Sequence, residues 1–479
     1  MAGIGFELKR IYKKRNLRSM LQGIGYSTIV TVGPTVMTIL AVILSYRLLG
    51  ISRESYANRE LLSSMILYTF IFPFMITTPI NTVWSRYIAD KIFTEQFKDI
   101  LSSYYVGLVC VAVLGALLGV PFLVHSFFVS DISIRFLFTG YCLYMSLLIV
   151  FFTMTYLSAT KDYKIITLYF FLGLLFGVLT GLFLVLGLND NLIDGILTGL
   201  MVGFFLIAVL QFTYVRRYFR VHSKNYKECI HYLMQYKLLF FSSFFYVLGL
   251  YIHNFVFWTT RMSVLVKNTF LSAPAYDMAS YLAMMTNIST MVIFIVVVET
   301  DFHDRYQLYS EAVLRLTLKE IRKAKDDMFR LLGNQIAYIV EVQAIITCLV
   351  FLIVEIFFPV IGFSGEIIQM YPVMAVGYFM IFIMYCNIIY LYYFSDHKGA
   401  FFTALFFLLV TFFVSLGARY LPIQFYGIGT FLGALFGWTY SFFRLRYMER
   451  NLDFHIYGNG KLLTEHREEM PTPVSYQKE

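Results

Sequence analysis

Twelve long apolar stretches constrain this chain more than any other feature of its sequence. Each holds about 20 residues or more, which is enough for a helix to cross a hydrocarbon core of ~30 Å. Only helices and closed barrels satisfy every backbone polar group in lipid, and the absence of strict two-residue alternation excludes the barrel. We therefore expect an all-α polytopic membrane protein with spans at 26–49, 61–85, 103–129, 132–158, 165–187, 193–215, 238–260, 278–298, 334–361, 367–395, 400–418 and 425–443.

The basic residues predict how these spans are oriented. Of the 38 lysines and arginines, 31 lie in the N-terminal segment, the even-numbered loops and the C-terminal segment, and only seven lie elsewhere. Basic flanks of membrane spans stay in the cytoplasm. We therefore expect both termini inside, with an inner-membrane, multi-pass location. The same rule, together with anionic lipid headgroups, accounts for the net charge of +9 without any nucleic-acid partner.

The spans divide six and six around a basic loop, which predicts two six-helix bundles. No residue-level repeat supports the duplication, so it rests on the span count alone. Near the start of the chain and in the longest loop, apolar residues form a stripe at helical spacing. This pattern predicts amphipathic segments at the inner interface. The expected parts are an amphipathic helix at 1–25, bundles at 26–220 and 238–445, a linker at 221–237, an amphipathic segment at 304–332 within the second bundle, and a tail at 446–479.

Motifs for catalysis and cofactors are missing. The sequence has no P-loop, no HExxH, no paired CxxC and no GxSxG, and no loop is large enough for a catalytic domain. The five cysteines have neither disulfide nor metal spacing. We therefore expect no enzyme activity, cofactor or metal, and look for function in the polar groups of the spans.

Polar residues are costly inside a membrane and usually face protein or water. Arg86 ends span two at the inner face, and Glu299 and Asp301 end span eight there. Interfacial solvation together with inter-helix gating pairs is the alternative to a role in the substrate path for these three. Further candidates are His253 and Asn254 in span seven and Asn287 in span eight, for which helix–helix hydrogen bonds are the alternative. The last candidate is Glu341 in span nine, for which solvation in a water-filled vestibule is the alternative.

Two stretches resemble a known family. The start MAGIGFEL, followed by the Gly-Pro pair of span one, is similar to the opening of the PelG family, a membrane component of the Pel exopolysaccharide system. The sequence VETDFHDRYQLYSEA at 298–312 resembles the segment that follows span eight in that family. The matching positions are Gly3, Gly5, Phe6, Glu7, Gly33, Pro34, Glu299, Thr300, Asp301 and Phe302. The pair His253-Asn254 departs from an Asp-Lys pair that is frequent in the family.

The resemblance implies membership of the multidrug/oligosaccharidyl-lipid/polysaccharide (MOP) flippase superfamily, with two bundles in a V. It implies export of a nascent polymer rich in N-acetylhexosamine for the biofilm matrix. A cytoplasmic glycosyltransferase of the PelF type and membrane partners of the PelD and PelE type would complete the complex. Cyclic di-GMP would act through a partner and not through this chain. On this basis we expect a polar, aromatic-lined path between the halves, with Arg86, Glu299 and Asp301 at its cytoplasmic mouth.

Three other functions remain open from the residues. A cation-coupled drug or small-molecule antiporter would use Glu341 or Glu299 for protonation. A lipid-linked oligosaccharide flippase would move finished repeat units through a side gap. A scaffold for a synthase complex would depend on the basic segment around 315–325 and not on cavity residues.

Overall fold

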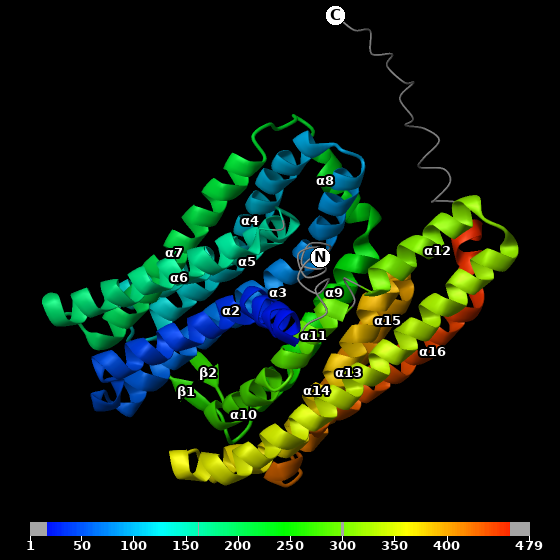
Figure 1. The fold of residues 1–479 in the computed structure, drawn as a ribbon. Coiled ribbons are helices and arrows are strands. Elements are labelled where there is room, and N and C mark those ends of the chain that lie inside the picture. Colours follow the sequence, from blue (N-terminus) through cyan, green and yellow to red (C-terminus); the bar gives the residue numbers. More distant parts are fainter. Residues whose placement is uncertain (1–16, 161, 298–300, 460–479) are drawn as a thin grey trace, which may run out of the picture.

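The computed structural model describes residues 17–160, 162–297 and 301–459 and is helical almost throughout (Figure 1). The family-motif positions Gly3, Gly5, Phe6, Glu7, Glu299 and Thr300 lie outside the described residues. The first half contains α2 (Leu17–Leu49), α3 (Tyr56–Phe93), α4 (Phe97–Val129), α5 (Ile134–Thr160), α6 (Tyr163–Leu182), a π-helical turn (Phe183–Gly187) and α7 (Leu192–Tyr218).

The second half contains α9 (Lys237–Phe257), α10 (Pro274–Met285), α11 (Ile288–Val297), α13 (Leu318–Ile361), α14 (Gly365–Tyr393), α15 (His397–Ala418) and α16 (Ile428–Asn459). Short elements connect them: η1 (Ile51–Arg53), α8 (Lys227–Gln235), the antiparallel hairpin of β1 (Val264–Val266) and β2 (Phe270–Ser272), α12 (His303–Arg315) and η4 (Ile423–Phe425).

Helices lie at the predicted spans, but the predicted number of twelve membrane-crossing helices is not confirmed in the described residues. Nine helices in the described part of the chain are long and apolar enough to cross a membrane, which confirms a multi-pass membrane protein. The eighth predicted span, 278–298, is not one helix. It begins earlier, at Pro274, and is interrupted between Met285 and Ile288, so that α10 holds too few residues to cross alone.

Several helices also run past the predicted borders of the spans. α2 begins at Leu17, so residues 17–25 continue into span one and do not form a separate segment. α16 continues to Asn459, well into the predicted tail. α13 starts at a capping box between Thr317 and Glu320 and ends at Gly362, whose φ of 94° is favourable for glycine. The predicted amphipathic segment 304–332 is thus α12 plus the first turns of α13.

The two halves repeat one packing scheme, which was not detectable in the residues. α6 packs on α7 as α15 packs on α16, and α5 packs on α7 as α14 packs on α16. α3 packs on α5 as α10 packs on α14, and α2 packs on α6 as α9 packs on α15. α4 lies on α5 as α13 lies on α14. Buried apolar residues accordingly form two clusters, each largely within one half.

Glycines allow the closest of these helix pairs to form. In α6 and α7 the glycines recur every four residues, at 173, 177, 181 and at 195, 199, 203. A Cβ added at Gly199 would lie 2.6 Å from the carbonyl oxygen of Gly177, which is closer than packed atoms come. Small residues are the usual means by which membrane helices approach backbone to backbone.

The halves meet through two helix pairs that are equivalent in the repeat. α3 packs along α9, and α11 packs on α2. Figure 1 shows the first half, in blue to green, on one side and α13 to α16, in yellow to red, on the other. We call the end that carries β1 and β2 the hairpin end, and the opposite end, with α8, α12 and the basic loops, the basic end.

Candidate functional site

An aromatic ladder joins α3 to α9 where the two halves meet. The rings of Tyr68 and Trp258 stack with their centroids 5.2 Å apart. Nearer the basic end, the hydroxyls of Thr82 and Ser243 lie 2.8 Å apart. Two more ring pairs lie between these levels: Phe72–Phe255 at 6.1 Å and Phe74–Tyr251 at 6.4 Å. The boundary between the halves is therefore aromatic, but it is packed along these two helices. A path along this boundary requires the helices to separate.

The hairpin end of this boundary is closed by the edge of β2. The Tyr68 hydroxyl donates to the Leu271 carbonyl oxygen at 2.8 Å and accepts from the Leu271 N–H at 3.1 Å. The hydroxyls of Ser64 and Ser272 lie 3.4 Å apart. Phe270 packs against Tyr68, with 5.2 Å between the ring centroids. These contacts, which we call the outer clamp, hold the hairpin of the second half against α3 of the first.

His253 lies at the centre of a buried network within the second half. Its Nδ1 is 2.8 Å from the Tyr276 hydroxyl, and its Nε2 is 3.3 Å from the Tyr378 hydroxyl. The Tyr378 hydroxyl in turn lies 2.7 Å from that of Ser280. The side chains come from α9, α10 and α14, and His253 has no exposed surface. The network therefore joins three helices, which agrees with the interhelical bonding considered for His253.

Asn254 leads to a carboxylate that the sequence analysis did not select. Its Nδ2 donates to Asp277 Oδ1 at 2.7 Å. Asp277 also accepts from Trp258 Nε1 at 2.9 and 3.0 Å and from the Ala273 N–H at 3.0 Å. Asp277 is partly buried, and all of these donors are neutral groups. It joins the end of α9 to the start of α10, and through Trp258 it supports the outer clamp.

A sequence signal for Asp277 was available. Pro274 followed by an acidic residue within one turn is typical of a helix start. The predicted span begins at residue 278, which leaves Asp277 outside it. The helix instead begins at Pro274, which places Asp277 in its first turn.

Asn287 lies at the break between α10 and α11. Its Oδ1 is buried and accepts no hydrogen bond from the described residues. The neighbouring Thr286 is held by other helices: its hydroxyl lies 2.9 Å from that of Tyr371, and its carbonyl oxygen is 3.5 Å from Gln343 Nε2. Gln343 is fully buried, whereas Glu341, two residues earlier on α13, is exposed. The structure thus separates the two polar residues of span nine onto opposite faces of the helix.

At the basic end, Arg86 connects α3 to the second half. Its Nη1 lies 3.1 Å from His397 Nε2, and its guanidinium lies 4.5 Å from the centre of the Tyr236 ring. Asp301 is exposed. Phe302 is fully buried and packs on Tyr390, with 4.9 Å between the ring centroids. The predicted mouth of Arg86, Glu299 and Asp301 is therefore seen in part only, because Glu299 lies outside the described residues.

The other matching positions in span one are placed within α2. Gly33 is half-buried and Pro34 is buried. α2 continues through Pro34, and the Thr38 hydroxyl donates to the Pro34 carbonyl oxygen at 2.8 Å. Hydroxyl groups of this kind satisfy backbone oxygens near a proline in a membrane helix.

The linker helix α8 is fixed to the basic end of α3. Lys91 Nζ lies 2.9 Å from an Asp99 oxygen and 2.7 Å from a Glu228 oxygen. The Tyr232 hydroxyl donates to the Asp90 carboxylate. Burial, followed by the hydrogen bond to Asp90, raises the pKa of Tyr232, so the hydroxyl keeps its proton and acts as a donor. The linker is therefore joined to the basic end of α3 by these contacts.

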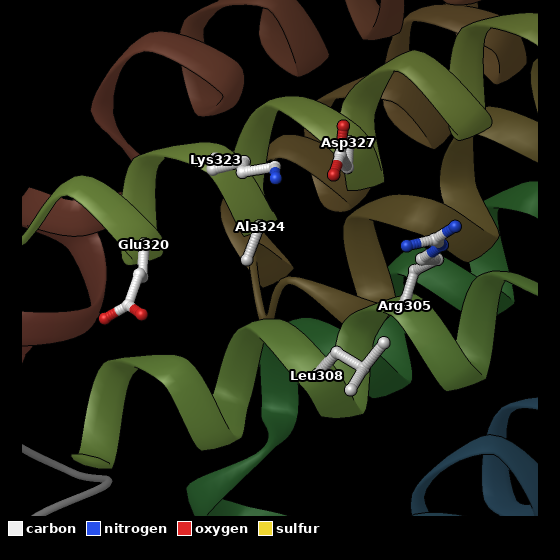
Figure 2. A pocket seen from close by; sticks show the side chains of 6 residues that line it. All are labelled: Arg305, Leu308, Glu320, Lys323, Ala324 and Asp327. Atoms are coloured by element: carbon white, nitrogen blue, oxygen red, sulfur yellow. The ribbon is translucent and has the colours of Figure 1, made fainter. Parts of the chain in front are cut away.

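Beyond the basic end, α12, the start of α13 and the end of α16 form a projecting stalk. Lys325 Nζ lies 2.6 Å from Asp453, which also accepts from the Tyr309 hydroxyl at 3.0 Å. A small pocket of about 160 Å³ separates α12 from α13. Figure 2 shows the side chains that line it, two from α12 and four from α13: Arg305, Leu308, Glu320, Lys323, Ala324 and Asp327.

The described residues contain no grouped set of metal ligands. Among residues 17–160, 162–297 and 301–459, no three histidine, cysteine or acidic side chains are grouped as a metal ion would require. The polar groups of the core form hydrogen-bond networks between helices. The arrangement therefore offers hydrogen-bonding groups and ring faces.

The fold is that of known membrane transporters. An outward-facing multidrug resistance transporter of the MATE family in the MOP superfamily has a TM-score of 0.58 and 14% identity, with 89% of this chain and 96% of that chain covered. A MOP superfamily transporter from Pyrococcus furiosus has a TM-score of 0.57 and 12% identity, covering 90% and 95%. A eukaryotic MATE transporter has a TM-score of 0.56 and 10% identity, covering 92% and 97%.

Sequence comparison is more specific. A family model described as PelG, an exopolysaccharide exporter, matches residues 1–457. Among curated proteins, no sequence matches the chain. The structural likeness establishes the fold, and the family model covers nearly all of the sequence.

Proposed function

Since the chain belongs to the PelG family of exopolysaccharide exporters, we propose that it moves a growing, N-acetylhexosamine-rich exopolysaccharide of the Pel type across the cytoplasmic membrane for the biofilm matrix. The observation that carries this proposal is the match over residues 1–457, joined to a transporter fold. A membrane transporter fits both, and neither suggests catalysis.

The boundary between α3 and α9 supports a route for such a polymer. Sugar rings present apolar C–H faces and a polar rim, and tyrosine and tryptophan offer a ring face with a polar group. Tyr68, Trp258 and Tyr251 provide such faces, and Thr82 and Ser243 provide hydroxyls. When the two helices separate, these groups would line the route. Because they are packed together now, the same groups would also form the closed gate.

We further propose that the basic end faces the cytoplasm, with both termini inside. A glycosyltransferase of the PelF type would deliver the polymer there, and membrane partners of the PelD and PelE type would complete the complex. Cyclic di-GMP would act on a partner. The proposed entrance includes Arg86, which connects α3 to α9 and α15, and Glu299 and Asp301 at the following connection.

A reversible lock tests whether the boundary must open. The hydroxyls of Ser64 and Ser272 are 3.4 Å apart across the outer clamp, so Ser64→Cys with Ser272→Cys in a cysteine-free chain places two thiols within reach of a disulfide. We expect oxidation to stop export and dithiothreitol to restore it. The measurement is extracellular polymer detected with a lectin for N-acetylhexosamines, at equal membrane levels of protein.

A matched control lies within one half. Asn387 Nδ2 and the Ser441 hydroxyl are 2.9 Å apart between α14 and α16, which stay together when the halves separate. Asn387→Cys with Ser441→Cys should form a disulfide without affecting export. Normal export from a fully oxidised 64–272 pair would contradict the proposal that polymer passes between α3 and α9.

A cation-coupled small-molecule antiporter is the second candidate. It is favoured by the likeness to multidrug MATE transporters and by Asp277, a carboxylate whose donors are all neutral. Such an antiporter would need a carboxylate that gains and loses a proton. Under this alternative, Asp277→Asn would remove drug resistance and leave the polymer matrix unchanged. Under the export proposal, any effect of Asp277→Asn appears in the matrix.

A further inference from the structure

Glu341 occupies an unexpected place on α13. It is exposed, and its neighbours on the same face are apolar: Tyr338 is 50% exposed and Ile345 62% exposed. At about 100° per residue, Ile339 and Gln343 each lie ~200° from Glu341, in opposite directions around the helix. Both are buried in the core of the second half. Glu341 therefore points directly away from the protein.

The depth of Glu341 follows from the pairing of α13 with α14. The Tyr390 hydroxyl lies 3.5 Å from Gln335 Oε1, and Glu355 lies beside Ile368 and Gln369 at the other end. The helices are antiparallel, so the level of Glu341 on α14 is near residue 384. α14 carries no charge between Glu366 and its end at Tyr393. Glu341 is then about five residues, or ~8 Å, from the middle of that helix.

A position ~8 Å from mid-depth lies inside a hydrocarbon core whose half-thickness is ~15 Å. A carboxylate there is too deep for its short side chain to reach the headgroups. An acidic group near the centre of a membrane helix is costly to insert. The charge is therefore expensive unless another group covers it.

The equivalent helix of the first half carries no such charge. α4 occupies the same place in the first half, and α4 and α13 are the two least buried of the candidate spans. Between Asp99 and His125, α4 has no charged residue. α13 makes its main contacts with α11, α12 and α14, all in the second half. The outward face of α13 thus differs from its counterpart by a carboxylate that neither packing nor the boundary between halves requires.

We propose that Glu341 marks the contact site for a membrane-spanning helix of another protein, which supplies a lysine or arginine at this depth. A cation is the group that compensates a carboxylate in lipid. A second copy of this chain is disfavoured, because a two-fold contact on this face would bring Glu341 against its own copy. The site is independent of the transported substrate. It would attach this chain to a membrane partner along the exposed stripe of Tyr338, Ile345 and Leu352.

Photo-crosslinking in native membranes tests this site. Ile345, one turn from Glu341, is replaced by the photoreactive benzoyl-phenylalanine in the full-length chain. We expect a product in which the attached peptide is a membrane-spanning segment that contains a lysine or arginine. With Glu341→Ala in addition, the yield should fall about ten-fold or more, because a charge pair shielded from water contributes at least that factor. The same probe at Val113, exposed on α4, should attach to lipid only.

Glu341→Ala should not destabilise the isolated chain, since the side chain packs on nothing in the described core. An unchanged or raised melting temperature of the purified variant is expected, and a large decrease would indicate a structural role instead. Restoration of the product by combining Glu341→Lys with a carboxylate at the partner's basic residue would establish the pair. Attachment to a second copy or to lipid alone at position 345 would overturn the proposal. So would labelling of Glu341→Cys by a membrane-impermeant maleimide, which requires water at this face.

Discussion

Replacing Asp277 should loosen the hairpin end of the protein. Its carboxylate accepts hydrogen bonds from Asn254 Nδ2 at 2.7 Å, from Trp258 Nε1 at 2.9 Å and from the Ala273 N–H at 3.0 Å. Asp277→Ala leaves all three donors without this acceptor. Asp277→Asn keeps one carbonyl oxygen of nearly the same shape but removes the charge. The pair of variants therefore separates loss of contact from loss of charge.

The size of the effect follows from these three bonds. A hydrogen bond to a charged group contributes about 1.5–3 kcal/mol, and the lower part of the range applies because Asp277 is only partly buried. For Asp277→Ala we expect the free energy of unfolding to fall by about 3–5 kcal/mol. For Asp277→Asn we expect a fall of roughly half that amount. Trp258 loses a polar contact and, with it, part of its alignment on Tyr68.

Unfolding of the purified chain by titration with dodecyl sulfate in mixed micelles, followed by tryptophan fluorescence, measures both variants. Combining Asp277→Ala with Trp258→Phe isolates the bond between these side chains. Its coupling energy should be about 1.5 kcal/mol, since each single variant already removes the same bond. Additive effects of the two substitutions, or unfolding of Asp277→Ala at the wild-type midpoint, would refute this account of the hairpin end.

Three further substitutions have defined outcomes. Gly199→Ala should lower the melting temperature, because its Cβ would overlap the backbone of α6 and overpacking costs about 1–3 kcal/mol, whereas Gly333→Ala meets nothing within 4 Å and should raise stability by up to ~1 kcal/mol. Asp453→Asn removes the charge partner of Lys325 and should make the stalk more sensitive to limited proteolysis, with Asp453→Glu as the conservative comparison. Glu299→Gln should reduce exported polymer at unchanged membrane levels of protein, and normal export would exclude its role at the entrance.

Hydropathy predicted the helices well because the cost of unpaired backbone in lipid decides where they lie. The interruption of span eight could not be predicted in the same way. Thr286 is an ordinary residue for a membrane helix, and its contacts come from Tyr371 and Gln343, which are more than 50 residues away in sequence. The repeat of the two halves was hidden for a similar reason. It is preserved in which helices pack together and not in which residues they contain.

The cost of polar groups in lipid located some of the polar candidates but not the direction in which each side chain faces. Cost in lipid selected His253 and Asn254, and both form hydrogen bonds with residues of α10. The same cost selected Glu341 but could not predict which way its side chain faces. Whether it points into the core, towards a transport route or towards lipid depends on which helices pack against α13. Asp277 was missed because a carboxylate at the end of an apolar stretch looks like a loop residue. Helix-start chemistry at Pro274 carries the better information there.

The length of α13 has a mechanical consequence. A single helix of 44 residues runs from the capping box in the stalk to the hairpin end, a distance of ~66 Å. Because the helix is continuous, it can transmit a rigid-body rotation from one aqueous compartment to the other. A tilt of about 10° would displace one tip relative to the other by roughly 11 Å at this length. A displacement of the stalk can thereby move the opposite end of α13, across the whole bilayer, without any change in the conformation of the helix.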